Sequence, residues 1–147
     1  TAKNVIAEEA NMTGTIRYFH ANLIDKISDA INRVVKNTAL AYGANAEVEI
    51  VSGCLPVIND KNLTKQANLI IEKLWGPEAI ITLPKNCGVD DFCYYGQKVP
   101  IHYAFFGTKN EMKHSNYPMH NPYFDIDEDV IINIAQYFCQ FSYDYLK

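Results

Sequence analysis

The sequence predicts an α/β protein with two regions that divide near residue 52. Three observations support this class. Apolar residues recur with the period of a helix in three long segments, and they alternate with polar residues in two short ones. Short apolar runs bounded by turn residues lie between the later helices, as is typical of buried strands. The first region follows the order strand, helix, strand, which is half of a two-layer α/β module.

In the first region, side chains alternate over residues 12–19, which predicts a strand. An apolar stripe begins at Leu23 and predicts an amphipathic helix over residues 23–42. Gly43 follows directly, at the position where a left-handed residue commonly ends a helix. Residues 46–50 alternate again, with glutamates on the wet face, and predict a second strand.

The second region begins after residue 52 and carries a helix at residues 63–74, stopped by Gly76 and Pro77. The elements expected after it are buried strands at residues 79–83 and 99–106, helical turns at residues 90–95 between them, and a last helix capped by Asp127. Acidic residues in the first turn of that last helix match the positive end of its macrodipole.

Composition excludes several classes of protein. With 48% hydrophobic and 20% charged residues, the chain has the make-up of a soluble globular domain. The net charge is -4 and no basic stripe exists, which argues against a nucleic-acid partner. No apolar run approaches the roughly 20 residues that span a bilayer. Four cysteines without a Cys-x-x-Cys pair favour a reducing, cytoplasmic setting. Since residue 1 is not Met and the first segment resembles mid-strand sequence, we expect further sequence upstream.

A long loop is expected at residues 107–127, and loops of that length are usually functional. Pro118 and Pro122 each fix their own φ and restrict the residue before them, which holds His120 between two stiff points. A pre-set imidazole suits a metal ligand. A lone loop histidine is more often structural or solvated, so the pattern by itself leaves both interpretations open.

Four sequence motifs, in this order, resemble those of metal-dependent amidohydrolases of the aminoacylase and carboxypeptidase type. They are residues 4–6 (N-V-I) followed by 14–19 (G-T-I-R-Y-F), residues 56–60 (P-V-I-N-D), residues 88–92 (G-V-D-D-F) and residues 118–128 (P-M-H-N-P-Y-F-D-I-D-E). Together they extend over nearly the whole chain. The pattern is most similar to the branch that includes hippurate hydrolases and indole-acetyl-amino-acid hydrolases.

The resemblance implies a domain organisation and a chemistry. Residues 1–52 would be the second half of a two-layer lid or dimerisation domain, and residues 53–147 the C-terminal α/β segment of the metal-binding catalytic domain. The complete enzyme would hydrolyse N-acyl amino acids with water activated on divalent metal ions, zinc or manganese. It would form a homodimer through the lid.

The same resemblance implies roles for three residues. His120 matches the last metal ligand, Arg17 the lid arginine that holds the substrate carboxylate, and Asn4 the lid asparagine near the scissile carbonyl. A guanidinium fits a carboxylate through two charge-assisted bonds, and an amide N–H can stabilise developing oxyanion charge. The simpler alternatives are that Arg17 is a wet-face strand residue and that Asn4 only forms a turn.

The chain also departs from the family pattern, at Ala7, Asp90 and Asn121, where the family carries Pro, Glu and Ser. Asp90 either orients a metal ligand or is a first-turn helix acid, and the helix role is preferred for Asp91. His20, His102 and His114 match no motif, so we expect them to be structural or exposed.

No general-base glutamate and no second metal ligand of the family pattern lies in these residues. We therefore expect the isolated chain to be inactive on N-acyl amino acids and to bind zinc at most weakly by itself. Two other functions remain open: a non-catalytic dimerisation module that pairs through an exposed strand edge, and a small ligand-binding domain without metal.

Overall fold

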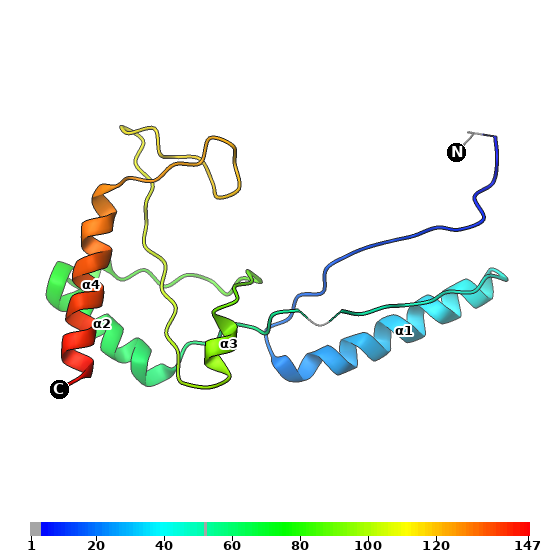
Figure 1. Cartoon of the computed structure of the whole chain (residues 1–147), viewed down its shortest axis with the longest axis horizontal. Coiled ribbons are helices and arrows are strands. Elements are labelled where there is room, and N and C mark those ends of the chain that lie inside the picture. The colour runs from blue at the N-terminus through cyan, green and yellow to red at the C-terminus, as the bar shows by residue number, and fades with distance from the viewer. Residues whose placement is uncertain (1–3, 52) are drawn as a thin grey trace. The chain divides into compact units, whose positions relative to one another are not determined.

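The computed structural model describes residues 4–51 and 53–147. The chain divides into two compact units, Thr1–Pro56 and Val57–Lys147. The elements, in chain order, are the short 3₁₀ helix η1 (Ala21–Leu23) and helix α1 (Ile24–Ala41) in the first unit, then α2 (Lys61–Trp75), the 3₁₀ helix η2 (Pro77–Ala79), α3 (Cys93–Gly96) and α4 (Asp129–Tyr145) in the second (Figure 1). Among the described residues, none of these helices has both the length and the apolar character needed to cross a bilayer.

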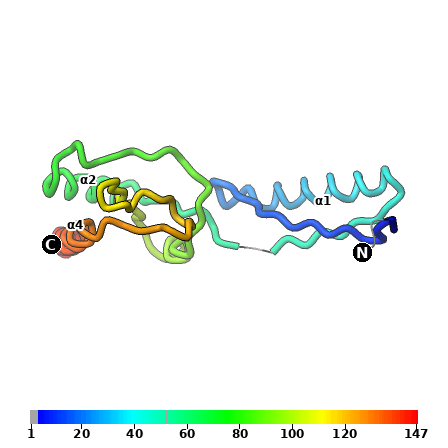
Figure 2. Tube along the Cα trace, turned by 90° about the horizontal axis from the view of Figure 1, so that it is seen from above, coloured from blue at the N-terminus to red at the C-terminus, as the bar shows by residue number. Residues whose placement is uncertain are grey.

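Helix α1 confirms the helix predicted at residues 23–42, and Gly43 ends it as expected. Gly43 has a φ of +70°, its N–H donates to the Leu40 carbonyl at 3.0 Å, and the Ala44 N–H donates to the Ala39 carbonyl at 2.9 Å. These two bonds satisfy carbonyls that the last turn would otherwise leave open. Beyond the cap, residues 44–51 turn back and run along α1 (Figure 1 and Figure 2).

The predicted strands at residues 12–19, 46–50, 79–83 and 99–106 do not form as paired strands. Within the described ranges, β pairing is confined to one isolated bridge between Asn110 and Ser115. Strand hydrogen bonds need a second extended segment in matching register, and the described residues form no such ladder beyond that bridge. The structure therefore shows the helices of the predicted α/β class and not its sheets.

The side-chain alternation that predicted those strands is nevertheless present. In the first unit, Ile16 and Tyr18 are half-buried while Thr15 and Arg17 are exposed. Residues 46–50 follow the same rule, with the two glutamates outside. Alternation depends on extended backbone, which places successive side chains on opposite faces, and it does not require pairing.

The core of the second unit lies between α2 and α4. The side chain of Asp60 begins α2 by accepting hydrogen bonds from Asn62 N at 2.9 Å and Leu63 N at 3.0 Å. Gly76, with a φ of +88°, ends the helix. The buried residues of this core are Ala67, Ile70 and Tyr137, and the half-buried residues packed against them are Ile71, Leu74, Trp75, Phe106 and Phe141.

The segment at residues 99–106 is held by side-chain and turn contacts rather than by a neighbouring strand. Asn59 Nδ2 donates to the Tyr103 carbonyl at 2.8 Å, and Tyr103 N donates back to Asn59 Oδ1 at 2.8 Å. The Asp60 N–H adds a bond to the Ile101 carbonyl at 2.8 Å. Because side chains alternate along this segment, Phe106 faces the α2–α4 core while Tyr103 contacts Phe92 on the other side.

We expect Ile70→Ala to destabilise the protein by about 2–4 kcal/mol, because it leaves a cavity in the α2–α4 core. Ile70 is 5% exposed, whereas its neighbour Leu69 on the same helix is 56% exposed. The matched variant Leu69→Ala should therefore change stability by less than about 1 kcal/mol. Urea unfolding of both variants measures the difference, and equal losses would show that the packing of α2 is misassigned.

Candidate functional site

The loop at residues 107–127 contains two consecutive β-turns, and His120 lies in the first. Asn121 N donates to the Pro118 carbonyl at 3.1 Å, and Phe124 N donates to the Asn121 carbonyl at 2.9 Å. His120 is the third residue of the first turn and has a φ of +70°. Met119 before it is not in the left-handed region, so the turn is of type II, which requires positive φ at the third position.

Side chains reinforce this pair of turns. Asn121 Oδ1 accepts a hydrogen bond from Tyr123 N at 2.8 Å, which caps the second turn. The rings of Tyr117 and Tyr123 contact each other with centroids 5.6 Å apart, and so close the loop on either side of His120. His120 itself is exposed. The structure thus places its imidazole at the apex of a short segment fixed by turn bonds and a ring contact.

The base of the loop is tied to the start of α4 by Asp127. Its N–H donates to the Thr108 carbonyl at 3.0 Å, and its Oδ2 accepts from Asn110 Nδ2 at 2.6 Å. Its Oδ1 accepts from Lys113 Nζ at 2.6 Å and from Asp129 N at 3.2 Å. Asp127 therefore satisfies the first amide of α4, as its predicted capping role requires, although the helix begins two residues later.

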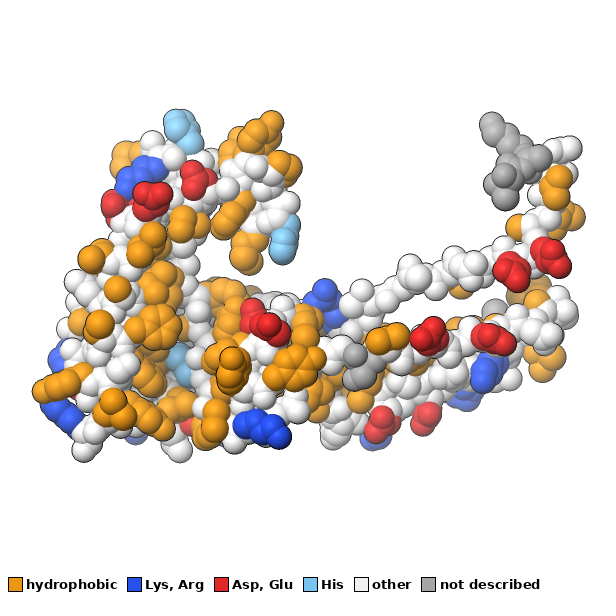
Figure 3. Space-filling model, viewed as in Figure 1, with side chains coloured by type: hydrophobic (Ala, Val, Ile, Leu, Met, Phe, Trp, Pro, Cys, Tyr) orange, Lys and Arg blue, Asp and Glu red, His pale blue; other side chains and the backbone are white. Residues whose placement is uncertain are grey.

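Opposite charges gather at this base, where acidic and basic side chains lie beside the start of α4 (Figure 3). Lys113 also donates to Asp129 Oδ2. Hydrogen bonds from Lys113 and Asn110 lower the pKa of Asp127 from its ordinary 3.8 to about 2. The two carboxylates raise the pKa of Lys113 to about 12. The ion pair consequently stays charged throughout the neutral range.

Two of the motifs that resemble the family, residues 56–60 and 88–92, both contact Tyr103. Besides its backbone bonds to Asn59, Tyr103 donates from its hydroxyl to Asp90 Oδ2 at 3.0 Å. Asp90 Oδ1 also accepts from Phe92 N at 2.9 Å. Its carboxylate raises the pKa of the Tyr103 hydroxyl, mainly by accepting that hydrogen bond. In this structure Asp90 is thus a structural acceptor that begins the turn into α3, while Asp91 is exposed.

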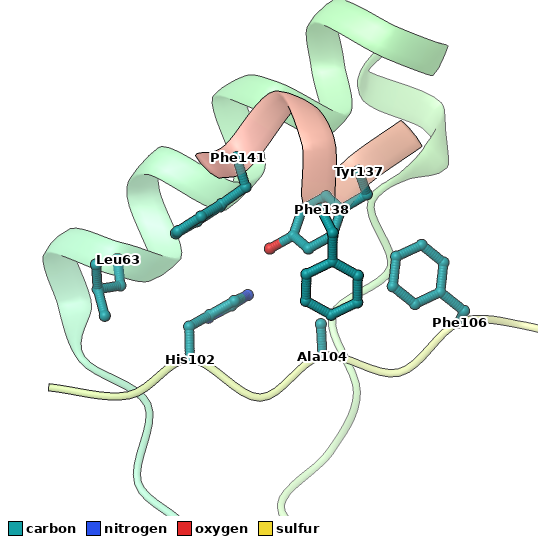
Figure 4. A pocket seen from close by; sticks show the side chains of 7 residues that line it. All are labelled: Leu63, His102, Ala104, Phe106, Tyr137, Phe138 and Phe141. Atoms are coloured by element: carbon teal, nitrogen blue, oxygen red, sulfur yellow. The ribbon is translucent and has the colours of Figure 1, made fainter. Parts of the chain in front are cut away.

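A small pocket that sequence reasoning missed lies on the second unit, and His102 forms part of its wall (Figure 4). Its volume is about 150 Å³, and its lining residues are Leu63, His102, Ala104, Phe106, Tyr137, Phe138 and Phe141. His102 Nδ1 lies 3.2 Å from Thr64 Oγ1, and burial lowers the pKa of the imidazole. The alternation over residues 99–106 is the pattern that places His102, Ala104 and Phe106 on one face.

The other predicted site residues lie in the first unit. Asn4 lies in a turn and is exposed, and Arg17 is exposed on the face that also carries Thr15. His120 lies in the second unit. The roles of Asn4 and Arg17 toward a substrate, and of His120 toward a metal, therefore remain predictions at this point.

The described residues provide one candidate imidazole and not a complete metal site. Across residues 4–51 and 53–147, no group of three or more His, Cys, Asp or Glu side chains is placed to hold a metal ion. A zinc site ordinarily uses three or four protein ligands. An exposed imidazole on a fixed turn fits one of those positions, because neutral histidine is a common ligand of zinc.

Comparison with known proteins shows that the chain is similar in sequence to a peptidase family and to several curated hydrolases. The model of the family described as Peptidase family M20/M25/M40 matches residues 4–144. "Thermostable carboxypeptidase 2" of Saccharolobus solfataricus is 33% identical over 89% of this chain and 33% of its own length. "IAA-amino acid hydrolase ILR1-like 2" of Arabidopsis thaliana is 27% identical over 99% of this chain and 34% of its own. "Putative amidohydrolase YhaA" of Bacillus subtilis is 32% identical over 90% and 34%.

The chain thus spans about a third of the length of these curated relatives.

The depressed pKa of Asp127 predicts a pH-dependent stability. A carboxylate whose pKa is lowered on folding stabilises the folded state fully above its unfolded pKa, and this contribution is lost as the pH falls through the folded pKa. With values of 3.8 and about 2, the contribution of the Asp127 charge to the stability difference between wild type and Asp127→Asn should be constant above about pH 5 and largely lost by pH 2.

Urea unfolding at pH 6, 4 and 2 measures this difference. Asp125→Asn is the matched control, because Asp125 lies exposed on the same loop and accepts from the adjacent Ile126 N–H. It should change stability less than Asp127→Asn does at pH 6. A difference that stays constant down to pH 2 would contradict the charged pair at the loop base.

Proposed function

Because this chain belongs to peptidase family M20/M25/M40, we propose that it forms part of a metal-dependent amidohydrolase that cleaves N-acyl amino acids. The observation that carries the proposal is the position of His120 at the apex of a loop fixed by turn hydrogen bonds. His120 belongs to the motif that resembles the family's last metal-ligand motif. The names of these relatives, a carboxypeptidase, an amidohydrolase and an IAA-amino acid hydrolase, support hydrolysis of an amide bond next to an amino acid.

The proposed domain assignment follows the predicted one. The lid or dimerisation domain contains residues 1–52, and the catalytic domain contains residues 53–147. The lid would join two copies of the protein into a homodimer. Supporting this assignment, η1 and α1 lie in a unit separate from that of α2, α3 and α4.

Three side chains have proposed roles in the reaction. A divalent metal, when bound, activates a water molecule for attack on the amide carbonyl. His120 would hold that metal through a neutral imidazole nitrogen. Arg17 would bind the substrate carboxylate through two parallel hydrogen bonds, and the Asn4 amide would donate to the carbonyl oxygen as it gains negative charge. The general base and the further ligands would come from parts of the protein beyond these residues.

We expect His120→Asn in the full-length protein to weaken metal binding by at least about 100-fold, because a ligand is lost. Asparagine tolerates the left-handed backbone of this position, so the turn should persist. His114→Asn is the matched control, since His114 is also exposed, lies on the same loop and has a φ of +59°. Metal content after dialysis and the metal dissociation constant are the measurements.

Wild-type metal binding by His120→Asn would contradict the ligand role. It would also favour the non-catalytic alternatives.

For Arg17, we expect Arg17→Ala in the full-length protein to lower kcat/KM about 30- to 1000-fold, or about 2–4 kcal/mol, with metal content and folding unchanged. Arg17→Lys should restore little, because an ammonium group cannot reproduce the bidentate fork. Thr15→Ala, an exposed residue on the same face, is the control and should keep activity near wild type.

A thermodynamic cycle separates carboxylate binding from a general loss. Wild type and Arg17→Ala are each assayed with an N-acyl amino acid and with its carboxamide analogue. If Arg17 binds the carboxylate, the wild type should have a much lower kcat/KM for the analogue than for the N-acyl amino acid. The Arg17→Ala variant should have similar kcat/KM values for the two substrates. Two losses that simply add would show that Arg17 does not contact the carboxylate.

A further inference from the structure

Asp127 makes most of the contacts that close the base of the loop carrying His120, through its backbone N–H and its carboxylate. The loop has an outgoing limb, residues 107–115, and a returning limb, residues 116–127, which carries His120. Asp127 contacts the outgoing limb at three positions: the Thr108 carbonyl at 3.0 Å, Asn110 Nδ2 at 2.6 Å and Lys113 Nζ at 2.6 Å. Only 19% of its side chain is exposed, compared with 83% for Asp129, the other carboxylate that Lys113 contacts. Asp127 is therefore the better enclosed partner.

The partners of Asp127 are themselves fixed. Asn110 and Ser115 form an antiparallel bridge, with bonds of 3.2 Å and 3.0 Å between their backbones. Ser115 is 2% exposed, and its hydroxyl accepts from Asn110 N at 3.0 Å. Lys113 projects from the tight turn between these two residues. The outgoing limb is consequently a small closed hairpin, and not a free strand of loop.

The turn bonds around His120 set its local geometry, but they do not set where the turns lie relative to α4. In the described part of the chain, the polar contacts that join residues 107–115 to the start of α4 all involve Asp127 or Lys113. A ligand that is already ordered binds metal more tightly, because binding then does not have to supply the ordering free energy.

We propose that Asp127 is a positioning residue for the metal site, which acts by clamping the base of the loop that presents His120. This inference rests on the proposed function, in which His120 is a metal ligand. Asp127 contacts neither metal nor substrate in this role. It holds Asn110 and Lys113 against the first turn of α4, and the returning limb with His120 is fixed as a consequence.

The test compares Asp127→Asn, Lys113→Met and the double variant in the full-length protein, with Asp125→Asn as the matched control on the same loop. The first measurement is hydrogen exchange of the turn amides of Asn121 and Phe124 in the metal-free protein. We expect exchange at least about 10-fold faster in both single variants, with the amides of α2 and of α4 beyond its first turn unchanged. The control should exchange as the wild type does.

The second measurement is the dissociation constant for Zn²⁺. We expect it to rise about 10-fold in each single variant, at the lower end of the effect of residues that orient a metal ligand. Because both variants break the same clamp, the double variant should lose no more than either single one. Lys113→Met leaves the capping carboxylate of Asp127 in place, so it remains informative if Asp127→Asn unfolds the start of α4.

Unchanged exchange of the turn amides and an unchanged Zn²⁺ constant would overturn the proposal, as would losses that add in the double variant. Faster exchange throughout α2 and α4 would also overturn it, since Asp127 would then serve general stability. A failure of the proposed function looks different. In that case Asp127→Asn still loosens the turn amides, but neither it nor His120→Asn changes the Zn²⁺ constant.

Discussion

The side-chain amide of Asn59 acts for the segment at residues 99–106 as a neighbouring strand would. It donates to and accepts from the Tyr103 backbone, at 2.8 Å in each direction, which is the reciprocal pattern of a β-ladder rung. Much of the second unit depends on this pair of bonds. With the segment fixed, one face contributes Phe106 to the α2–α4 core, and the other brings Tyr103 within hydrogen-bonding distance of Asp90. One amide thereby connects the α2–α4 core with the turn into α3.

The helices could be predicted from the sequence because the information that forms them is local. The apolar stripe of α1, its Gly43 cap, and the Asp60 cap of α2 all act within a few residues along the chain. The strands could not be predicted in the same way. Alternation at residues 12–19 and 46–50 records which face is buried, whereas pairing depends on a partner segment that alternation does not specify.

The candidate site shows the same division between local and distant contacts. Pro118 and Pro122 indicated a stiff loop around His120, and the two β-turns agree with that expectation. The resemblance to a known family supplied the ligand role, which the residues alone left open. Neither source of information pointed to Lys113 or to the hydroxyl of Tyr103, because their partners Asp127 and Asp90 lie 14 and 13 positions away in sequence. Contacts of that range follow from how the loops fold back.

The positive φ of His120 means that backbone conformation and side-chain chemistry favour different residues at position 120. Left-handed backbone costs a side-chain-bearing residue roughly 1–2 kcal/mol relative to right-handed backbone, whereas glycine adopts it without that penalty. Backbone conformation alone would therefore favour glycine at position 120, and the proposed role of the imidazole as a metal ligand would oppose it. In a lineage that no longer needed that imidazole, drift should carry the position toward glycine or asparagine while both prolines stay. A relative with glycine between those two prolines would then be one that has lost the proposed metal ligand, and its sequence alone would identify it.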